Sequence, residues 1–427
     1  MPDSQAMRVL ALVSVLLLPG APAQSPVKTG LEVLVEQNFA ALEGKRVGVV
    51  TNHTGLTYDR RRTIDVLAQA PKVKLTAIFS PEHGISGRLE DPNVPSGADE
   101  ATGVPIYSLH DRQQYRPTPE MLQHLDALIY DIQDVGARFY TYITTLGYML
   151  EAAAKARIPF YVLDRPNPIN GVGVEGPLLD AKYFSFVGYM RMPIRHGMTV
   201  GELARMYNGE NKLGAELHVI PMQGWKRSMW FDQTGLEWIN PSPNMRNLTQ
   251  AILYTGACLL ESRQVSVGRG TDTPFQIIGA PWFKGREVSA YLNARKLPGV
   301  RFMPRRFRPS ASLYQDQECD GLEIQLLNRD RFEPVRMGLE LLHATLRFHP
   351  GKFDLSSVMR LLGSEEAAAR LQRGQSGSAV AKALRGQLRT FRRVRARYLL
   401  YRWALIGSEP ARVRAIMTLW GPYEPCS

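Results

Sequence analysis

Four acidic residues stand in turn-like sequences and could carry acid–base chemistry. Glu82 lies in Ser-Pro-Glu-His-Gly, Asp131 and Asp134 stand three positions apart, and Glu175 lies in Val-Glu-Gly-Pro. Hydrolysis of a glycosidic bond commonly uses a protonated carboxylic acid for the leaving oxygen, and a nucleophile, base or stabilising group on the other face of the sugar. Glu82 is therefore the candidate general acid, and the other three acids are candidates for the second role.

Each of these acids also has a structural interpretation. Glu82 could cap a helix or form a salt bridge within its loop. Asp131 and Asp134 could form turns through side-chain-to-backbone hydrogen bonds, which Asp favours. The two aspartates could instead stabilise an oxocarbenium-like transition state, or orient a 2-acetamido group that attacks its own anomeric carbon. Both interpretations stay open.

Three arginines near these clusters are candidates for binding an acidic substrate. Arg138, Arg165 and Arg269 lie in loops or at helix starts, and a guanidinium group binds a carboxylate through two parallel hydrogen bonds. Each could equally form a structural ion pair, and we expect Asp164 to hold Arg165 and its loop. The remaining candidate substrate-binding residues are Asn52, His53, His83, Tyr140, Asp164, Asn167 and Asn244.

Apolar runs typical of strands alternate with segments of helical spacing in the first half of the chain. We expect strands at 46–51, 73–79, 127–132, 160–163 and 217–220, and helices at 61–69 and 140–156. This alternation is typical of a parallel sheet covered by helices. Because the carboxyl ends of parallel strands open on one edge, where ligands bind, the polar clusters that follow these strands should meet in space.

The N-terminus has the layout of a secretory signal. Arg8 precedes an apolar run at 9–18, and Ala21-Pro22-Ala23 forms a small-residue cleavage site. The run is about half as long as the roughly 20 apolar residues that a membrane-spanning helix needs. We therefore expect cleavage after Ala23, a periplasmic or extracellular protein, and no integral membrane segment in the mature chain.

Length and composition predict two globular domains. The 427 residues carry a formal charge of +12 and are 44% hydrophobic, and one core rarely organises so long a chain. We expect an α/β domain with a parallel sheet at 24–250 and a mixed α/β domain at 251–427. A basic stretch at 391–402 (FRRVRARYLLYR) indicates an amphipathic helix, either with a solvated face or adhering to an anionic polymer or membrane surface. No nucleic-acid partner is expected.

The sequence provides no motif for a cofactor or a metal. No Gly-x-Gly-x-x-Gly opens a helix after the first predicted strand, and no Gly-Lys-Ser/Thr occurs. Cys258, Cys319 and Cys426 allow at most one disulfide, and neither Cys-x-x-Cys nor His-x-x-x-His is present. We expect neither a nucleotide cofactor nor a structural zinc site.

Six strings occur together in a fixed order along the chain. They are SPEHG (80–84), YDIQDVGARFYTY (130–142), LDRPNP (163–168), VEGP (174–177), NPSPNM (240–245) and VGRGTDTPF (267–275). Together they resemble the exo-acting β-N-acetylmuramidases of the NamZ type, and the resemblance runs from about Gly30 to about Tyr401. One departure is His110-Asp111, where the family pattern leads us to expect Tyr-Gly.

The resemblance implies a fold, a substrate and one catalytic residue. It implies a Rossmann-like N-terminal domain, a smaller C-terminal domain and a site in the cleft between them. It also implies release of non-reducing-terminal β-1,4-linked N-acetylmuramic acid from peptidoglycan fragments. The glutamate of the family's Pro-Glu-His-Gly motif falls on Glu82.

Two other classes of protein remain as alternatives. One is a periplasmic protein that captures muropeptides without cleaving them, although clustered acids would repel the carboxylate of such a ligand. The other is a metal-dependent hydrolase that uses His53 or His83 together with the aspartates, although no ligand spacing supports it.

Overall fold

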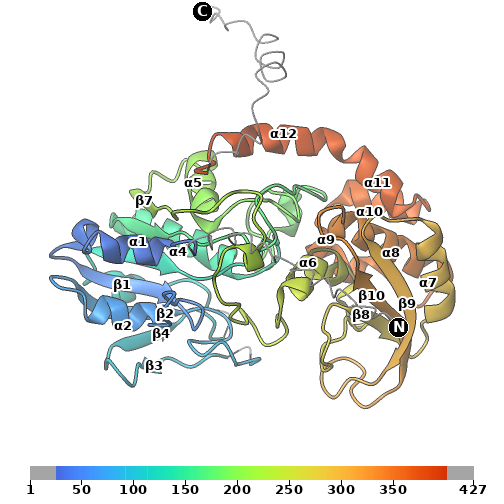
Figure 1. Ribbon diagram of the computed structural model, residues 1–427, viewed down its shortest axis with the longest axis horizontal. Coiled ribbons are helices and arrows are strands. Elements are labelled where there is room, and N and C mark those ends of the chain that lie inside the picture. The colour runs from blue at the N-terminus through green and yellow to red at the C-terminus, as the bar shows by residue number, and fades with distance from the viewer. Residues whose placement is uncertain (1–25, 92, 113, 402–427) are drawn as a thin grey trace, which may run out of the picture.

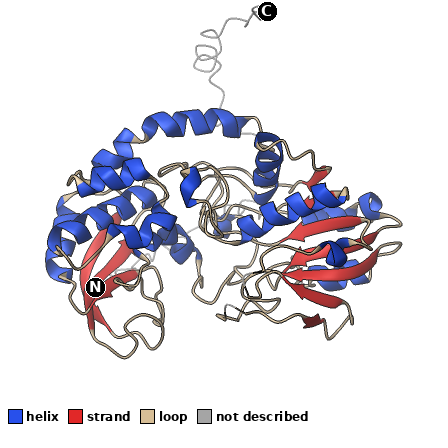
Figure 2. Cartoon of the chain, turned by 180° about the vertical axis from the view of Figure 1, so that it is seen from behind, coloured by secondary structure: helices blue, strands red, loops and turns tan. Residues whose placement is uncertain are grey.

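The computed structural model describes residues 26–91, 93–112 and 114–401. The expected secretory signal, Arg402 and Cys426 lie outside these residues. Figures 1 and 2 show two lobes, each built around its own sheet, with one long helix lying across both. Cys258 and Cys319 are buried free thiols. Within the described ranges, no helix is long and apolar enough to cross a membrane.

The first lobe contains a seven-stranded, mostly parallel sheet. Its strands are β1 (Arg46–Thr51), β2 (Lys74–Ser80), β3 (Gly97–Ala98), β4 (Pro105–Ser108), β5 (Ala127–Asp131), β6 (Phe160–Leu163) and β7 (Leu217–Ile220). They lie in the order β3-β4-β2-β1-β5-β6-β7, and only the β3–β4 pairing is antiparallel within the described part of the chain. Without β3, this is the strand order of doubly wound open sheets, in which ligands bind beyond the carboxyl ends of the strands.

Helices cover both faces of this sheet because its strands are apolar on both sides. Val47 and Val49 of β1 belong to one core cluster, whereas Val50 belongs to the other, as the two-residue period of a strand requires. The first cluster includes side chains of α1 (Gly30–Glu36) and α2 (Thr63–Ala68), and the second includes α4 (Tyr142–Ala156) and α5 (Val200–Glu210). A short helix, α3 (Pro119–Leu122), precedes β5.

The second lobe is smaller and has an antiparallel sheet in the order β8-β10-β9. Its elements are α6 (Leu248–Ala257), β8 (Ile277–Ala280), α7 (Gly285–Ala294), β9 (Val300–Phe307), β10 (Cys319–Leu326), α8 (Pro334–Phe348), α9 (Met359–Leu362), α10 (Glu365–Gln372) and α11 (Gly377–Ala383). A Cβ atom on Gly338 of α8 would lie 2.4 Å from the Gly256 carbonyl oxygen of α6. Glycine therefore permits these two helices to pack backbone against backbone.

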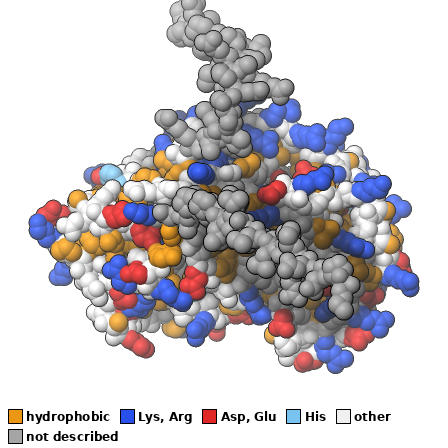
Figure 3. All heavy atoms as spheres, in the orientation of Figure 1, with side chains coloured by type: hydrophobic (Ala, Val, Ile, Leu, Met, Phe, Trp, Pro, Cys, Tyr) orange, Lys and Arg blue, Asp and Glu red, His pale blue; other side chains and the backbone are white. Residues whose placement is uncertain are grey.

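The chain returns to the first lobe through α12 (Arg385–Ala396), the long helix across the top of Figure 1. Arg395 is buried and its Nη2 donates to the Gly197 carbonyl oxygen at 2.6 Å, while Arg392 and Arg393 are exposed. The helix of the basic stretch thus ends at Ala396, and one of its arginines is structural. Figure 3 shows other Lys and Arg side chains around the outline of this face, among Asp and Glu.

Arg138 joins the two lobes, in contrast to the substrate-binding role considered for it. Its side chain is fully buried. Its terminal nitrogens donate to four backbone carbonyls: Pro177 (2.9 Å), Met192 (3.2 Å), Leu361 (2.6 Å) and Leu362 (3.1 Å). The first two belong to the first lobe and the last two to the end of α9. Burial lowers the pKa of Arg138 to about 9. The terminal nitrogens of Arg138 are therefore committed to the junction between the lobes.

Replacing Arg138 by Met should destabilise the protein strongly. The carbonyl oxygens of Pro177, Leu361 and Leu362 would lose the Arg138 donor, while that of Met192 would keep the Leu179 N–H. Each unsatisfied buried group costs about 1–3 kcal/mol. We expect the free energy of unfolding to fall by at least about 3 kcal/mol, measured by urea denaturation. The control is Arg191→Met, which removes an exposed arginine. Equal stability of the two variants would contradict the structural role of Arg138.

Candidate functional site

A cavity of about 390 Å³ lies between the two lobes, beyond the carboxyl ends of the parallel strands. The first lobe contributes Glu82, His83, Tyr140 and Thr141, and the second contributes Glu261 and Arg269. The remaining lining residues are Glu90, Phe139, Val187, Ser242, Asn244, Met245, Tyr254, Cys258, Gly270, Phe275, Ala311, Ser312 and Leu361.

A tight turn at the end of β2 places Glu82 at this cavity. The Gly84 N–H donates to the Pro81 carbonyl oxygen at 3.1 Å. His83 has a φ of +69°, a left-handed conformation that costs a non-glycine residue roughly 1–2 kcal/mol. The imidazole Nδ1 of His83 lies 2.7 Å from the Leu89 carbonyl oxygen and anchors the loop. The sequence Pro-Glu-His-Gly thus fixes the direction of the Glu82 side chain.

The carboxyl group of Glu82 has a different neighbour at each oxygen. Thr141 Oγ1 donates a hydrogen bond to Oε2. His110 Nε2 lies 3.9 Å from Oε1, and the Glu82 side chain is 28% exposed. Thr141 immediately precedes α4, so that helix positions the donor. Glu82 is thereby held in place and still accessible to a substrate, as a general acid must be.

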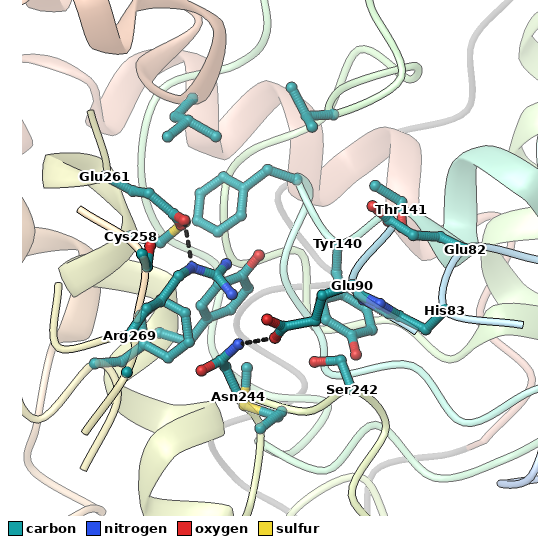
Figure 4. A pocket seen from close by; sticks show the side chains of 18 of the residues that line it. Glu82, His83, Glu90, Tyr140, Thr141, Ser242, Asn244, Cys258, Glu261 and Arg269 are labelled. Carbon is teal, nitrogen blue, oxygen red and sulfur yellow. Dashed lines mark hydrogen bonds and ion pairs between the residues drawn. The ribbon is translucent and has the colours of Figure 1, made fainter. Parts of the chain in front are cut away.

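Arg269 lies on the opposite wall and is oriented by Glu261. Its Nε donates to Glu261 Oε1 at 2.5 Å, and Figure 4 shows the guanidinium group directed into the cavity. Burial opposes the positive charge, but Glu261 outweighs this effect and raises the pKa of Arg269. Among the described residues, its two terminal nitrogens have no hydrogen-bond acceptor. They are available to bind a carboxylate.

Polar groups of Tyr140, Asn244 and Glu90 complete the interior. Asn244 Nδ2 donates to Glu90 Oε1 at 2.6 Å. The Tyr140 hydroxyl is buried without a hydrogen-bond partner among the described residues. A buried polar group of this kind needs a partner. It can take one from a ligand that enters the cavity.

Two of the predicted catalytic acids are committed to buried ion pairs. Asp131 is fully buried and accepts hydrogen bonds from Arg165 at 2.5 and 2.9 Å. Glu175 pairs with Arg195 at 2.8 Å and accepts from the Val335 N–H at 3.2 Å. Neither acid lines the cavity. The structure therefore places Asp131, Arg165 and Glu175 in the framework of the fold, because each charge is already paired.

Asp134 is also buried outside the cavity. Its Oδ2 accepts the Gly136 N–H at 2.7 Å, and its Oδ1 has no partner among the described residues. Burial raises the pKa of Asp134 to about 7. Asp134 is not among the residues that line the cavity.

The other expected binding residues mainly shape loops. Asp164 accepts from Tyr401 Oη (2.6 Å), Thr199 Oγ1 (2.7 Å) and Gly201 N (2.8 Å). It holds Arg165 only through the backbone N–H of that residue (3.1 Å), because the Arg165 side chain pairs with Asp131. Asn167 Nδ2 donates to the Met198 carbonyl oxygen at 2.9 Å, and Asn52 Oδ1 accepts the Thr54 N–H at 2.9 Å. These side chains stabilise the loops that follow the strands, and they do not line the cavity.

His53 lines a neighbouring hollow that shares Ser242 with the cavity. Its Nε2 lies 2.7 Å from the Asn240 carbonyl oxygen, and burial lowers its pKa. A Cβ atom on Gly87 would meet the His53 ring at 1.8 Å. Only glycine therefore allows the loop after Glu82 to pack on this ring.

Several residues of the site escape prediction from sequence. Glu90 and Glu261 lie outside the six strings, in irregular segments with no periodic signal. Thr141 and Ser242 lie inside those strings and could have been found there. In the described ranges, no group of three or more His, Cys, Asp or Glu side chains is arranged to hold a metal ion.

The fold and the site together define a class of enzyme. A doubly wound sheet and a smaller antiparallel domain enclose a cavity with the carboxyl group of Glu82 on one wall and, on the other, the Arg269 guanidinium, whose Nε is paired with Glu261. Family models for exo-β-N-acetylmuramidase NamZ match this chain, the N-terminal model over residues 47–249 and the C-terminal model over 252–401. The chain belongs to this family of glycosidases.

Individual relatives agree with this assignment. The chain is 42% identical to the peptidoglycan β-N-acetylmuramidase NamZ of Bacillus subtilis over 88% of its length and 91% of the relative's. A crystal structure of a DUF1343 family protein from Bacteroides fragilis superposes with a TM-score of 0.82 at 38% identity, covering 88% of this chain and 99% of that one. A second such protein from the same organism gives 0.73 at 31% identity, covering 89% and 100%.

Asp134→Asn should remove a pH dependence of stability. The folded-state pKa of Asp134 is about 7, whereas the unfolded value is near 3.9. Between these values the folded state binds more protons than the unfolded state, so this group makes stability fall as pH rises. Relative to wild type, the variant should therefore be more stable at pH 8 than at pH 5 in urea denaturation. A difference that is the same at both pH values would contradict the assignment.

Proposed function

We propose that this chain releases N-acetylmuramic acid from the non-reducing end of peptidoglycan fragments, with Glu82 as the general acid. The observation that carries this proposal is the cavity itself, in which Glu82 faces Arg269 across a space of about 390 Å³. A pocket of this size suits one substituted sugar. The family and the Bacillus subtilis relative support the substrate.

Glu82 supplies the proton that the leaving group needs. The protonated carboxyl group transfers its proton to the glycosidic oxygen while the bond from that oxygen to C1 breaks. Water then provides the hydroxyl group at C1. The Thr141 hydroxyl holds Oε2 throughout, because α4 fixes its position.

The second role falls to Glu90 or to the substrate itself. Glu90 lines the cavity and lies in no ion pair among the described residues, whereas Glu261 is paired with Arg269. Glu90 could activate water. Alternatively, the 2-acetamido group of the sugar attacks C1, and the unpartnered Tyr140 hydroxyl orients it.

Arg269 selects the acidic sugar. N-acetylmuramic acid differs from N-acetylglucosamine by a lactyl ether that carries a carboxylate. Glu82, Glu90 and Glu261 would repel that group, and Arg269 offers two terminal nitrogens to offset the repulsion. Of the three arginines considered from sequence, only Arg269 lines the cavity; Arg138 and Arg165 are occupied elsewhere.

We also propose that the protein is exported, and that residues 1–23 serve as its secretory signal. The charge, apolar run and small residues at 8–23 support export. A protein that binds muropeptides without cleaving them is the alternative function, and the variants below distinguish it.

Glu82→Gln keeps the shape of the side chain and removes its proton. We expect kcat on a β-N-acetylmuramyl disaccharide to fall by about 10²–10⁴-fold. A β-N-acetylmuramide with an activated aryl leaving group should lose less, because that group departs with little protonation. Both rates are measured in steady state. Equal, small losses on the two substrates would assign Glu82 a structural role, and an inactive wild type would favour the binding protein.

Arg269→Met should erase the preference for the muramyl substrate. Loss of one partner of a desolvated charge pair costs roughly 2–5 kcal/mol. Wild-type kcat/KM should be much higher for an aryl β-N-acetylmuramide than for the matching N-acetylglucosaminide, and the variant should lose most of this ratio. Arg263→Met, at an exposed position, serves as the control. A ratio near one in the wild type, or a ratio unaffected by the substitution, would reject selection by Arg269.

A further inference from the structure

His110 and Glu82 occupy matching positions beyond two neighbouring strands. Ser80 of β2 pairs with Ser108 of β4, and each side chain follows two residues later. The Leu109 N–H donates to the Ser80 carbonyl oxygen at 2.8 Å, which extends the contact past the strand ends. The parallel register itself therefore brings the imidazole to the carboxyl group.

The imidazole of His110 is enclosed on its other sides. The residue is 7% exposed. Its ring centroid lies 5.3 Å from that of Tyr115 and 5.5 Å from that of Phe186, and those two rings stack on each other at 4.1 Å. Nδ1 is buried without a partner among the described residues, whereas Nε2 faces Glu82 Oε1 at 3.9 Å. The His110 ring therefore packs beside Glu82, with its Nε2 toward the carboxyl group.

We propose that His110 is a positioning residue for Glu82, supportive while its ring is neutral and inhibitory once its ring is protonated. The neutral ring packs beside the carboxyl group and adds no charge. A nearby imidazolium would stabilise the ionised form of Glu82 over its protonated form. Glu82 would then lack the proton that the leaving group needs. Protonation adds one proton to the ring and breaks no covalent bond. This inference rests on the function proposed above.

The surroundings of His110 favour the neutral ring near pH 7. Burial lowers the pKa of His110, the Glu82 charge works in the opposite direction, and the charge of His83 lowers the pKa further. A second N–H would be buried on Nδ1 without an acceptor, which is costly. Glu82 and His83 are the titratable groups near the ring from the β2 turn; Tyr115 and Phe186 present aromatic faces. Protonation is therefore expected below about pH 6.5, the ordinary pKa of histidine.

The pH dependence of kcat for His110→Gln tests this proposal. Wild-type kcat on an aryl β-N-acetylmuramide should be lower at pH 5 than at pH 7 because of the added proton. Gln cannot take up that proton, so the ratio of kcat at pH 7 to kcat at pH 5 should be at least about threefold smaller in the variant. The matched control is His124→Gln, at an exposed histidine, which should keep the wild-type profile. Profiles of the same shape for His110→Gln and wild type would overturn the proposal.

A second measurement needs neither turnover nor a variant of His110. In the full chain, NMR titration gives the pKa of the His110 ring with and without Glu82→Gln. Loss of the Glu82 charge should lower that pKa further, and an unchanged value would overturn the proposal. This titration stands even if wild type does not cleave the muramide, so failure of the proposed function and failure of the pairing are separate results.

Discussion

A buried guanidinium sets the distance between the two halves of this enzyme. Arg138 donates to carbonyls of both lobes, and none of these groups can be left unpaired in the interior without a large cost. The next three residues, 139–141, line the cavity. Arg138, which does not line the cavity, therefore helps to fix the position of Thr141, and the Thr141 hydroxyl in turn holds Glu82. The Arg138 hydrogen bonds to backbone carbonyls of both lobes therefore help to fix the separation between the wall that carries Glu82 and the wall that carries Arg269.

More acidic residues follow the strands of the parallel sheet than the hydrolysis of a glycosidic bond requires. Of five expected acids, only Glu82 reaches the cavity; Asp131 and Glu175 are neutralised by arginines, and burial raises the pKa values of Asp134 and Asp164 to about 7. An acid that turns inward becomes part of the framework because water cannot solvate it there. Glu82, whose turn contains the left-handed residue His83, instead lines the cavity. The backbone conformation at each strand end, more than the choice of Asp or Glu, thus decides whether an acid is buried or faces the cavity.

The strands were predictable because their signal is local. The apolar runs at 46–51, 160–163 and 217–220 coincide with β1, β6 and β7; the run at 127–132 is one residue longer than β5, and the run at 73–79 is shifted by one residue from β2. The short strands β3 and β4 were not predicted. Of the predicted site residues, Glu82, His83, Tyr140, Asn244 and Arg269 line the cavity. Glu90 and Glu261 could not be found, since their placement depends on irregular loops and on how the lobes meet. The partners that occupy Arg138 and Arg165 are likewise distant in the chain, so no periodicity reports them.

Because the chain returns through α12, its C-terminal part contacts the first lobe as well as the second. Arg395 and Tyr401 contact the first lobe, and Tyr401 donates to Asp164 at the end of β6. The polypeptide that builds the second lobe therefore also completes the first. The two halves of the sequence are therefore not independent. Exchanging the C-terminal half between relatives would also exchange Arg395 and Tyr401, which contact the first lobe. Recombination within this family should favour whole chains over crossovers at the middle.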